Sequence, residues 1–335
     1  MSERKYRAIC FDLDGTLLPQ ELEDFLGRYF KALAVSMVKQ GAPLDEFKAS
    51  LNAGTKAMIG HDGGATNCQV YWQTFMSTME QLTGQTLKPQ DEWVELFTHF
   101  YENEFGLVGA DVVPDESMVG AVQSLAEKGY PLMLTTMPLF PPQAVEWRLK
   151  WAGLDAGQFE RLTTYENSTS SKPKLTYYAE NLAAMGLCGQ DVLMVGNNTV
   201  EDLAFMKLGA DAYVVTDHLL DPVGFDLSQV KHGSAADFLE WVNQLPMCEN
   251  PVSGVQTGVV DAAAAAAALE ANLSVSAEEL ARMEAEERRA RSAADDIGDA
   301  ISGAGSSSAE KPQAGGEYVH VGMDQLDGFT QEGER

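Results

Sequence analysis

The stretch CFDLDGTLL, residues 10–18, decides the fold of this chain of 335 residues. It ends a short apolar run over 6–13, which predicts a β-strand broken at Asp14-Gly15. Asp12 and Asp14 stand two positions apart, so both carboxylates can face one side of an extended segment. One carboxylate can then attack a phosphorus atom while the other handles protons. An Asp-Gly turn at the end of an edge strand, with no catalytic role, is the alternative.

After Pro114, short apolar segments alternate with helix-period segments. The predicted strands cover 130–136, 160–166, 191–196 and 211–216, and the predicted helices cover 116–129, 142–153, 174–186, 200–209 and 234–245. This alternation implies a parallel sheet covered by helices on both faces. We therefore predict an α/β, Rossmann-like three-layer core formed by residues 1–19 and 109–245, with ligands at the carboxyl ends of its strands.

The segment between the two core pieces, residues 20–108, has a different pattern. Four helix-period runs, at 21–41, 44–60, 68–84 and 90–106, each end near a glycine. They predict an all-helical insert whose core includes Trp72, Phe75, Trp93 and Phe97. The loop between its second and third helices holds candidate contacts to the core or to a ligand: Lys56, His61, Asp62 and Asn67. Ordinary turn chemistry is the alternative for Asp62 and the glycines after it.

Residues 246–335 are rich in Ala, Gly and Ser and contain little that could form a core. We predict a low-complexity acidic tail, mostly disordered, with a helix at 276–297 that begins with a Ser276/Glu279 capping box. The tail carries about 11 of the 27 net negative charges. A protein partner for this tail is one hypothesis.

The net charge of −27 argues against nucleic acids and anionic lipids as partners, because it repels both. No apolar run approaches the ~18 residues of a membrane span. Four widely spaced cysteines (Cys10, Cys68, Cys188 and Cys248) and an N-terminus without an apolar leader predict free thiols in a reducing compartment. We therefore expect a cytoplasmic protein without a membrane anchor.

Two further polar groups follow predicted strands. Thr136 ends the strand at 130–136, where its hydroxyl could bind a phosphoryl oxygen, and Thr135 is the alternative if the register differs by one. Lys172, in SSKPKL before a helix, could neutralise a phosphoryl group in transfer, with Lys174 as the alternative. Taken alone, each could be an ordinary strand or helix-start residue.

The last group is in DVLMVGNNTVED, residues 191–202. A buried strand ends at Gly196, and the amides and acids that follow are Asn197, Asn198, Glu201 and Asp202. Such oxygen ligands suit magnesium, which binds one or two carboxylates together with waters and substrate oxygens. A helix start capped by Asn198 or Thr199 is the alternative.

In this order and spacing, the four motifs resemble the haloacid dehalogenase-like superfamily over residues 6–245, and the insert resembles that superfamily's C1-type cap. TTMPLFP, TTYENSTSSKP and VLMVGNNTVED resemble a bacterial subgroup of its hydrolases. The resemblance implies that Asp12 attacks phosphate to form an aspartyl-phosphate and that Asp14 acts as general acid and base. It also implies that Thr136 and Lys172 orient and neutralise the phosphoryl group.

The resemblance further implies a magnesium ion held by Asp12, the main-chain carbonyl of Asp14, and Asp202, with Asn198 contributing an amide oxygen. An acid is usual in the family near Asn197 or Asn198. Because both residues are amides here, we expect weaker magnesium binding.

Together these features predict a magnesium-dependent phosphohydrolase acting on a small phosphorylated metabolite. Asp14 argues against a dehalogenase, since a halide leaving group needs no proton. Two alternatives stay open: a non-catalytic regulatory module whose acidic tail binds a protein, and a phosphotransferase or mutase that shares the aspartyl-phosphate.

Overall fold

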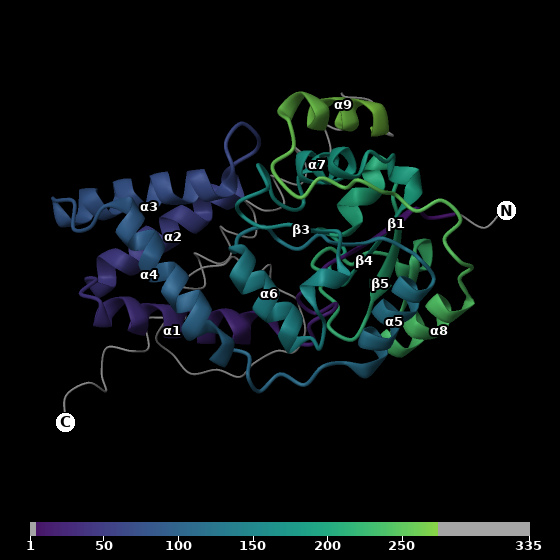
Figure 1. Cartoon of the computed structure of the whole chain (residues 1–335), viewed down its shortest axis with the longest axis horizontal. Helices are drawn as coiled ribbons and strands as arrows, with labels where there is room; N and C mark the ends of the chain where they lie inside the picture. Colours follow the sequence, from purple (N-terminus) through teal and green to yellow (C-terminus); the bar gives the residue numbers. More distant parts are fainter. Residues whose placement is uncertain (1–4, 274–335) are drawn as a thin grey trace.

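The computed structural model describes residues 5–273 and contains one parallel sheet (Figure 1). Its strands are β1 (Ala8–Phe11), β2 (Leu132–Leu134), β3 (Arg161–Leu162), β4 (Val192–Gly196), β5 (Asp211–Val215) and β6 (Lys231–Gly233). They are ordered β3-β2-β1-β4-β5-β6, and every neighbouring pair is parallel. The predicted α/β class is confirmed, although β6 was not predicted and β3 is shorter than the expected strand at 160–166.

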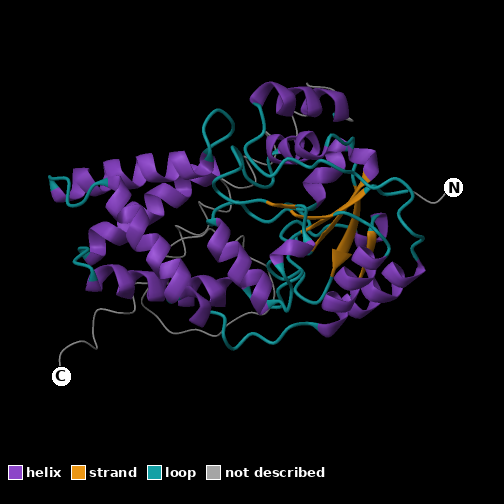
Figure 2. Ribbon diagram, viewed as in Figure 1, coloured by secondary structure: helices purple, strands orange, loops and turns teal. Residues whose placement is uncertain are grey.

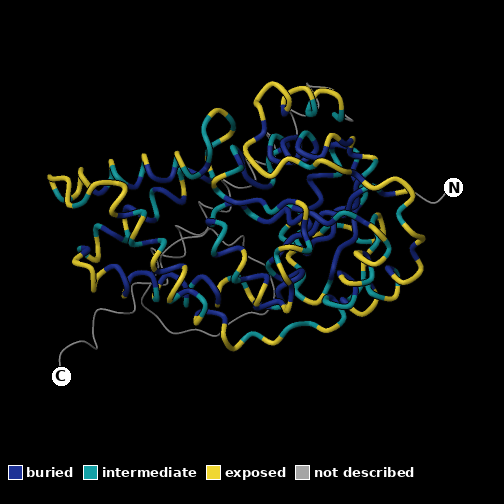
Figure 3. Tube along the Cα trace, in the orientation of Figure 1, coloured by how far each residue is buried: buried dark blue, intermediate teal, exposed yellow. Residues whose placement is uncertain are grey.

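Helices cover both faces of this sheet, as the continuous apolar strands require (Figure 2). One face packs on α5 (Glu116–Glu127) and α8 (Ala235–Gln244), and the other packs on α7 (Leu175–Met185) and the 3-10 helix η4 (Leu203–Leu208). Within β1, Phe11 faces the first layer and Cys10 the second, and both are fully buried. Every residue of β1, β2 and β4 is buried, and this central part of the sheet is dark blue in Figure 3.

The cap consists of four helices to one side of the sheet in Figure 1: α1 (Leu22–Lys39), α2 (Leu44–Gly60), α3 (Asn67–Thr83) and α4 (Gln90–Asn103). A Thr66/Gln69 capping box begins α3, and Gly84 ends it in the left-handed conformation. The predicted aromatic residues form its core: the Phe75 ring centroid lies 5.5 Å from that of Trp93 and 6.0 Å from that of Phe97. The 3-10 helix η1 (Phe105–Leu107) then leads back to the core.

The helix α6 (Pro142–Trp151) follows β2 and contacts both α4 and η1, so it adjoins the cap. Short 3-10 helices η2 (Ala156–Gln158), η3 (Gly189–Asp191) and η5 (Leu227–Gln229) complete the connections. Of the predicted helix at 200–209, only the 3-10 helix η4 forms. No helix within residues 5–273 is long and apolar enough to cross a membrane.

The prediction of a mostly disordered tail from residue 246 is wrong for 246–273. The helix α9 (Ala262–Asn272) packs along α7, and Arg161 donates to the main-chain carbonyls of Gln256 (2.5 Å) and Gly258 (2.9 Å). Apolar contacts of Val252 and Ala265 hold this segment together with the bonds to its main-chain carbonyls, and apolar periodicity does not report these bonds. The rest of the predicted tail, with its helix at 276–297, lies outside the described residues.

Candidate active site

The candidate site lies where β1, β2 and β4 end. Phe11 of β1 pairs with Leu134 and Val195, so the residues that follow these three positions meet at one edge of the sheet. The Asp12 amide donates to the Val195 carbonyl (2.8 Å), and the Thr135 amide donates to the Phe11 carbonyl (2.7 Å). The strand register therefore places the first, second and fourth predicted motifs side by side.

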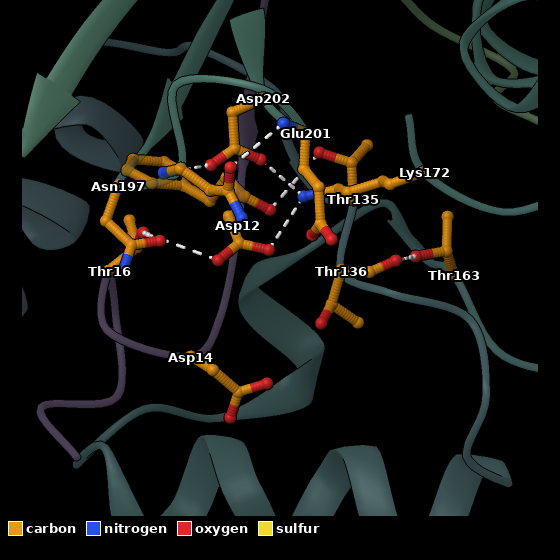
Figure 4. A network of polar contacts seen from close by, with 12 residues as sticks. Asp12, Asp14, Thr16, Thr135, Thr136, Thr163, Lys172, Asn197, Glu201 and Asp202 are labelled. Atoms are coloured by element: carbon orange, nitrogen blue, oxygen red, sulfur yellow. Dashed lines mark hydrogen bonds and ion pairs between the residues drawn. The ribbon is translucent and has the colours of Figure 1, made fainter. Parts of the chain in front are cut away.

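Lys172 joins two acids of the site (Figure 4). Its Nζ lies 2.7 Å from Asp12 Oδ1 and 2.6 Å from Asp202 Oδ1. The side-chain exposures are 1% for Lys172, 12% for Asp12 and 3% for Asp202, so all three groups are shielded from water. Two carboxylates share one cation, which leaves this cluster with a formal charge of −1 when all three are ionised.

The burial of this cluster changes how its groups hold protons. Burial raises the pKa of Asp12 to about 7, with Lys172 opposing the rise and the nearby Asp202 and Asp14 adding to it. Burial alone would lower the pKa of Lys172, but the carboxylates of Asp12 and Asp202 hold it well above its usual value. Lys172 is thus a fixed cation, whereas the charge of Asp12 depends on how much positive charge surrounds it.

Asn197 faces Asp12 from the end of β4. Thr16 Oγ1 lies 3.4 Å from both Asp12 Oδ2 and Asn197 Oδ1. The Asn197 amide nitrogen donates to the His218 carbonyl (2.6 Å), which turns the amide oxygen toward the site. The chain must approach closely here, because a Cβ added to Gly15 (φ 72°) would lie 2.2 Å from Asn197 Nδ2.

Asn198 does not face the site. Its Oδ1 accepts hydrogen bonds from the amides of Val200 and Glu201, both at 3.0 Å, so it caps the turn as the alternative interpretation held. Asp202 accepts from Lys172 through one oxygen and from the Asn198 amide through the other (2.9 Å), and each oxygen keeps a further lone pair. Asn198 thus turns its oxygen away from Asp12, and Asp202 as a magnesium ligand stays a prediction.

Two further oxygens that could bind a cation are Asp12 Oδ2 and Asn197 Oδ1. Both are hard donors of the kind magnesium prefers, and the main-chain carbonyl of Asp14 follows two residues after Asp12. Within residues 5–273 no group of three or more His, Cys, Asp or Glu side chains forms a metal cluster. The residues present fit a magnesium ion that keeps most of its waters or takes substrate oxygens.

The two threonines that follow β2, Thr135 and Thr136, have different environments. The Thr135 hydroxyl donates to the Phe11 carbonyl (3.2 Å) and contacts Met194 Sδ (3.4 Å), so it belongs to the sheet. The Thr136 hydroxyl is buried and has no hydrogen-bond partner within residues 5–273. A buried hydroxyl without a partner is a candidate to bind a ligand oxygen, which favours Thr136 over Thr135.

Asp14 is not turned toward Asp12. Its side chain points away from the Lys172 cluster in Figure 4, and its carboxylate is paired with the guanidinium of Arg148 on α6. The sequence interpretation missed Arg148. The signal was present: Ala144, Val145 and Leu149 form the buried stripe of α6, and an arginine stands on that stripe.

Over residues 6–209, more than half of the chain, the sequence matches the family described as haloacid dehalogenase-like hydrolase. The chain belongs to this family. No curated protein matches it.

Solved structures with a similar fold include three with different chemistry. A predicted phosphoglycolate phosphatase from Haemophilus somnus is 18% identical (TM-score 0.41), covering 70% of this chain and 97% of the other. An L-2-haloacid dehalogenase from Xanthobacter autotrophicus is 14% identical (TM-score 0.40; 72% and 99%). A putative β-phosphoglucomutase from Thermotoga maritima is 15% identical (TM-score 0.41; 71% and 99%). Likenesses this distant do not bear on the reaction.

In this haloacid dehalogenase-like hydrolase the cap is bonded to the loops that carry Thr136 and Lys172. The buried Asn67, first residue of α3, donates through Nδ2 to the carbonyls of Pro138 (3.1 Å) and Ser170 (2.9 Å). Ser170 also donates to Asp62 (2.8 Å). Two of the four predicted loop candidates thus contact the core.

Within residues 5–273, no hydrogen bond joins the side chain of Lys56 or His61 to the core. His61 Nε2 lies 2.8 Å from the Ala65 carbonyl, inside its own loop, and Lys56 is exposed. The loop's main chain adds a further link, because the Gly63 amide donates to the Thr169 carbonyl (2.7 Å). Hydrogen bonds therefore join the cap loop to the loop that precedes Lys172.

Proposed function

We propose that this haloacid dehalogenase-like hydrolase is a phosphatase that hydrolyses small phosphomonoesters through an aspartyl-phosphate on Asp12. The observation that supports this most is the buried Asp12 carboxylate, with one oxygen held by Lys172 and the other left toward Thr16 and Asn197. In the first step Asp12 Oδ2 bonds to phosphorus and the bond from phosphorus to the ester oxygen breaks. Lys172 stabilises the negative charge on the phosphoryl oxygens, and the free Thr136 hydroxyl donates to one of them.

Asp14 supplies the proton chemistry. An alkoxide leaving group needs a proton, so Asp14, once it has left Arg148 and taken up a proton from solvent, gives that proton to the ester oxygen in the first step. In the second step a water attacks the aspartyl-phosphate, Asp14 takes a proton from that water, and phosphate leaves with Asp12 restored. Because Asp14 is paired with Arg148 in this structure, it must turn toward Asp12 before either transfer.

Magnesium is the proposed cofactor. The Asp12 carboxylate, Asn197 Oδ1 and the Asp14 carbonyl would hold it, and when bound it would reduce the repulsion between the carboxylate nucleophile and an anionic phosphate. Because Asn197 is an amide, we expect a lower affinity than two carboxylates would give.

The test is phosphate release from p-nitrophenyl phosphate and a panel of phosphomonoesters, with and without magnesium. Wild-type protein should turn over at least one of them, and Asp12→Asn should lose that activity, while the exposed control Asp226→Asn keeps it. Mass spectrometry after acid quenching should find phosphate on the peptide that contains Asp12. Equal inactivity of wild type and Asp12→Asn across the panel would refute the proposal.

The same panel separates the alternatives. Halide release from 2-haloacids would indicate a dehalogenase, and transfer of phosphate to an added alcohol would indicate a phosphotransferase or mutase. A partner captured through residues 246–335, independent of Asp12, would favour a regulatory role, which the amide at Asn197 motivates. A cytoplasmic location stays a prediction from the sequence.

A further inference from the structure

Arg148 is a buried cation that has no role in the proposed chemistry. Its side chain is 1% exposed, and one guanidinium nitrogen donates to Asp14 Oδ2. Its Nε and Nη1 have no hydrogen-bond partner within residues 5–273, and neither does Asp14 Oδ1. Buried donors without partners are rare in proteins and mark places where a ligand or water binds.

Aromatic rings cover the guanidinium of Arg148. Its Cζ lies 5.2 Å from the ring centroid of Phe25 and 4.9 Å from that of Phe140. Phe25 belongs to α1, the first cap helix, and Phe140 lies between β2 and α6. Arg148 is therefore at the junction of cap and core, where movement of the cap would expose it.

The pairing with Asp14 creates a conflict with catalysis. Asp14 has to turn toward Asp12 to donate its proton, and that movement would leave the guanidinium buried without a counter-charge. A buried charge that loses its partner is strongly destabilised. Asp14 can leave Arg148 readily only if another anion takes its place.

We propose that the substrate supplies this anion: a carboxylate on its leaving group binds Arg148, displaces Asp14 and so releases Asp14 toward Asp12. The inference rests on the proposed phosphatase activity and names its substrate class, small phosphorylated carboxylic acids. Arg148 then acts as the residue that determines specificity. A phosphate ester without the carboxylate leaves Asp14 on Arg148 and reacts slowly.

The structure favours a carboxylate on a short chain. The site already holds a carboxylate, that of Asp14, and once Asp14 leaves Nη2, this nitrogen and the unpartnered Nε beside it can make a two-point contact with a carboxylate of the substrate. Asp12 and Asp14 are two residues apart, so their Cα atoms are at most about 7 Å apart. One or two carbon atoms should accordingly separate the ester oxygen of the phosphate from the carboxylate of the substrate.

Matched pairs of esters test the proposal. 2-Phosphoglycolate is compared with ethyl phosphate, and 3-phosphoglycerate with glycerol 3-phosphate, with p-nitrophenyl phosphate as the ester that needs neither carboxylate nor acid. In at least one pair we expect wild-type kcat/KM to favour the carboxylate by about 10²-fold, because a site built for a polar group rejects the analogue that lacks it. In Arg148→Met this ratio should fall below about 3-fold, a change that a uniform loss of activity cannot produce.

Two further variants show whether a lost preference comes from misfolding or from a general loss of activity. Arg148→Lys keeps a cation but not the two-point contact, so it should keep only part of the preference. Lys150→Met removes an exposed cation from the same helix and should keep the wild-type ratio. An equal preference in wild type and both Arg148 variants would overturn the proposal, as would no preference in either pair.

A binding measurement separates this inference from the proposed function. With Asp12→Asn, calorimetry should show tighter binding of the carboxylate ester of the same pair, and adding Arg148→Met should remove the difference. If that result is obtained while no ester is turned over by wild type, the phosphatase proposal fails and the Arg148 site stands. If a bisphosphate is preferred over both carboxylate esters, the assignment to a carboxylate is wrong.

Discussion

Replacing Lys172 by methionine removes the cation that lies between the buried carboxylates of Asp12 and Asp202. Methionine has a similar length and can fill the same space, so the change is mainly electrostatic. We expect a loss of folding stability that depends on pH, because the two acids can respond by taking up a proton.

The distances set the size of this effect. Lys172 Nζ lies 2.7 Å and 2.6 Å from the two oxygens, so they lie within about 5 Å of each other. At that separation and an effective dielectric constant of ~20, two carboxylates repel by roughly 3 kcal/mol. Protonating one of them at pH 7 costs about 4 kcal/mol, at 1.36 kcal/mol for each pH unit above an ordinary pKa of ~3.9. The variant should therefore lose roughly 3 to 4 kcal/mol at pH 7.

The loss should shrink as pH falls. Burial already raises the pKa of Asp12 to about 7 in the wild type, and removing the Lys172 cation raises it further. From about pH 6 upward the folded variant therefore holds more protons than the folded wild type. The stability of the variant relative to wild type therefore falls as pH rises through this range.

Urea unfolding followed by tryptophan fluorescence at pH 6, 7 and 8, without magnesium, measures this. Adding Asp202→Asn to Lys172→Met should recover about 2 kcal/mol at pH 7, since it removes one of the repelling charges. Lys150→Met is the control, because Lys150 is exposed and forms no ion pair within residues 5–273, so its effect should not vary with pH. A loss for Lys172→Met that is below ~1 kcal/mol, or is equal at pH 6 and pH 8, would refute the reasoning.

Three other predictions concern the metal, pH and thiols. Asn197→Asp should tighten magnesium binding, measured by calorimetry, by about tenfold or more, while Asn198→Asp leaves it unchanged; the reverse order would contradict the assigned geometry. Because burial raises the pKa of Asp12 to about 7 and the nucleophile must be ionised, kcat/KM at limiting magnesium should fall as pH drops below about 7. More magnesium should move this fall to lower pH, and a fall that ignores magnesium would count against Asp12 as its origin. Exposed Cys188 should react with a thiol reagent in the native protein, whereas Cys10, whose pKa burial raises to about 12, should react only after unfolding.

The position of the site could be predicted because it follows from one rule of parallel sheets. Asp12, Thr136 and the run after Gly196 each follow an apolar strand, and the parallel register brings such strand ends together. The family follows from the same motifs. The catalytic roles themselves stay predictions until the variants are measured.

The choice between neighbouring residues could not be predicted. Whether Asn197 or Asn198 faces Asp12 depends on the turn after β4, where the Asn198 side chain binds main-chain amides. The alternation of strands and helices in the sequence does not specify which of the two asparagines faces Asp12. Arg148 was missed because a single arginine on an apolar helix stripe more often extends its charged end to water than pairs with an acid inside. The strand β6 was missed because Lys231–Gly233 has no apolar pattern.

The bonds from Arg161 to residues 256 and 258 have a consequence for how the protein is made on the ribosome. Arg161, 2% exposed, needs these carbonyls, which lie almost a hundred residues later in the chain. The Val252 amide likewise bonds the Arg7 carbonyl beside β1. Until residues 252–258 have left the ribosome, the Arg161 guanidinium at β3 lacks the two acceptors of its Nη1, so the sheet edge next to the Lys172 loop should be among the last parts of the nascent chain to become stable.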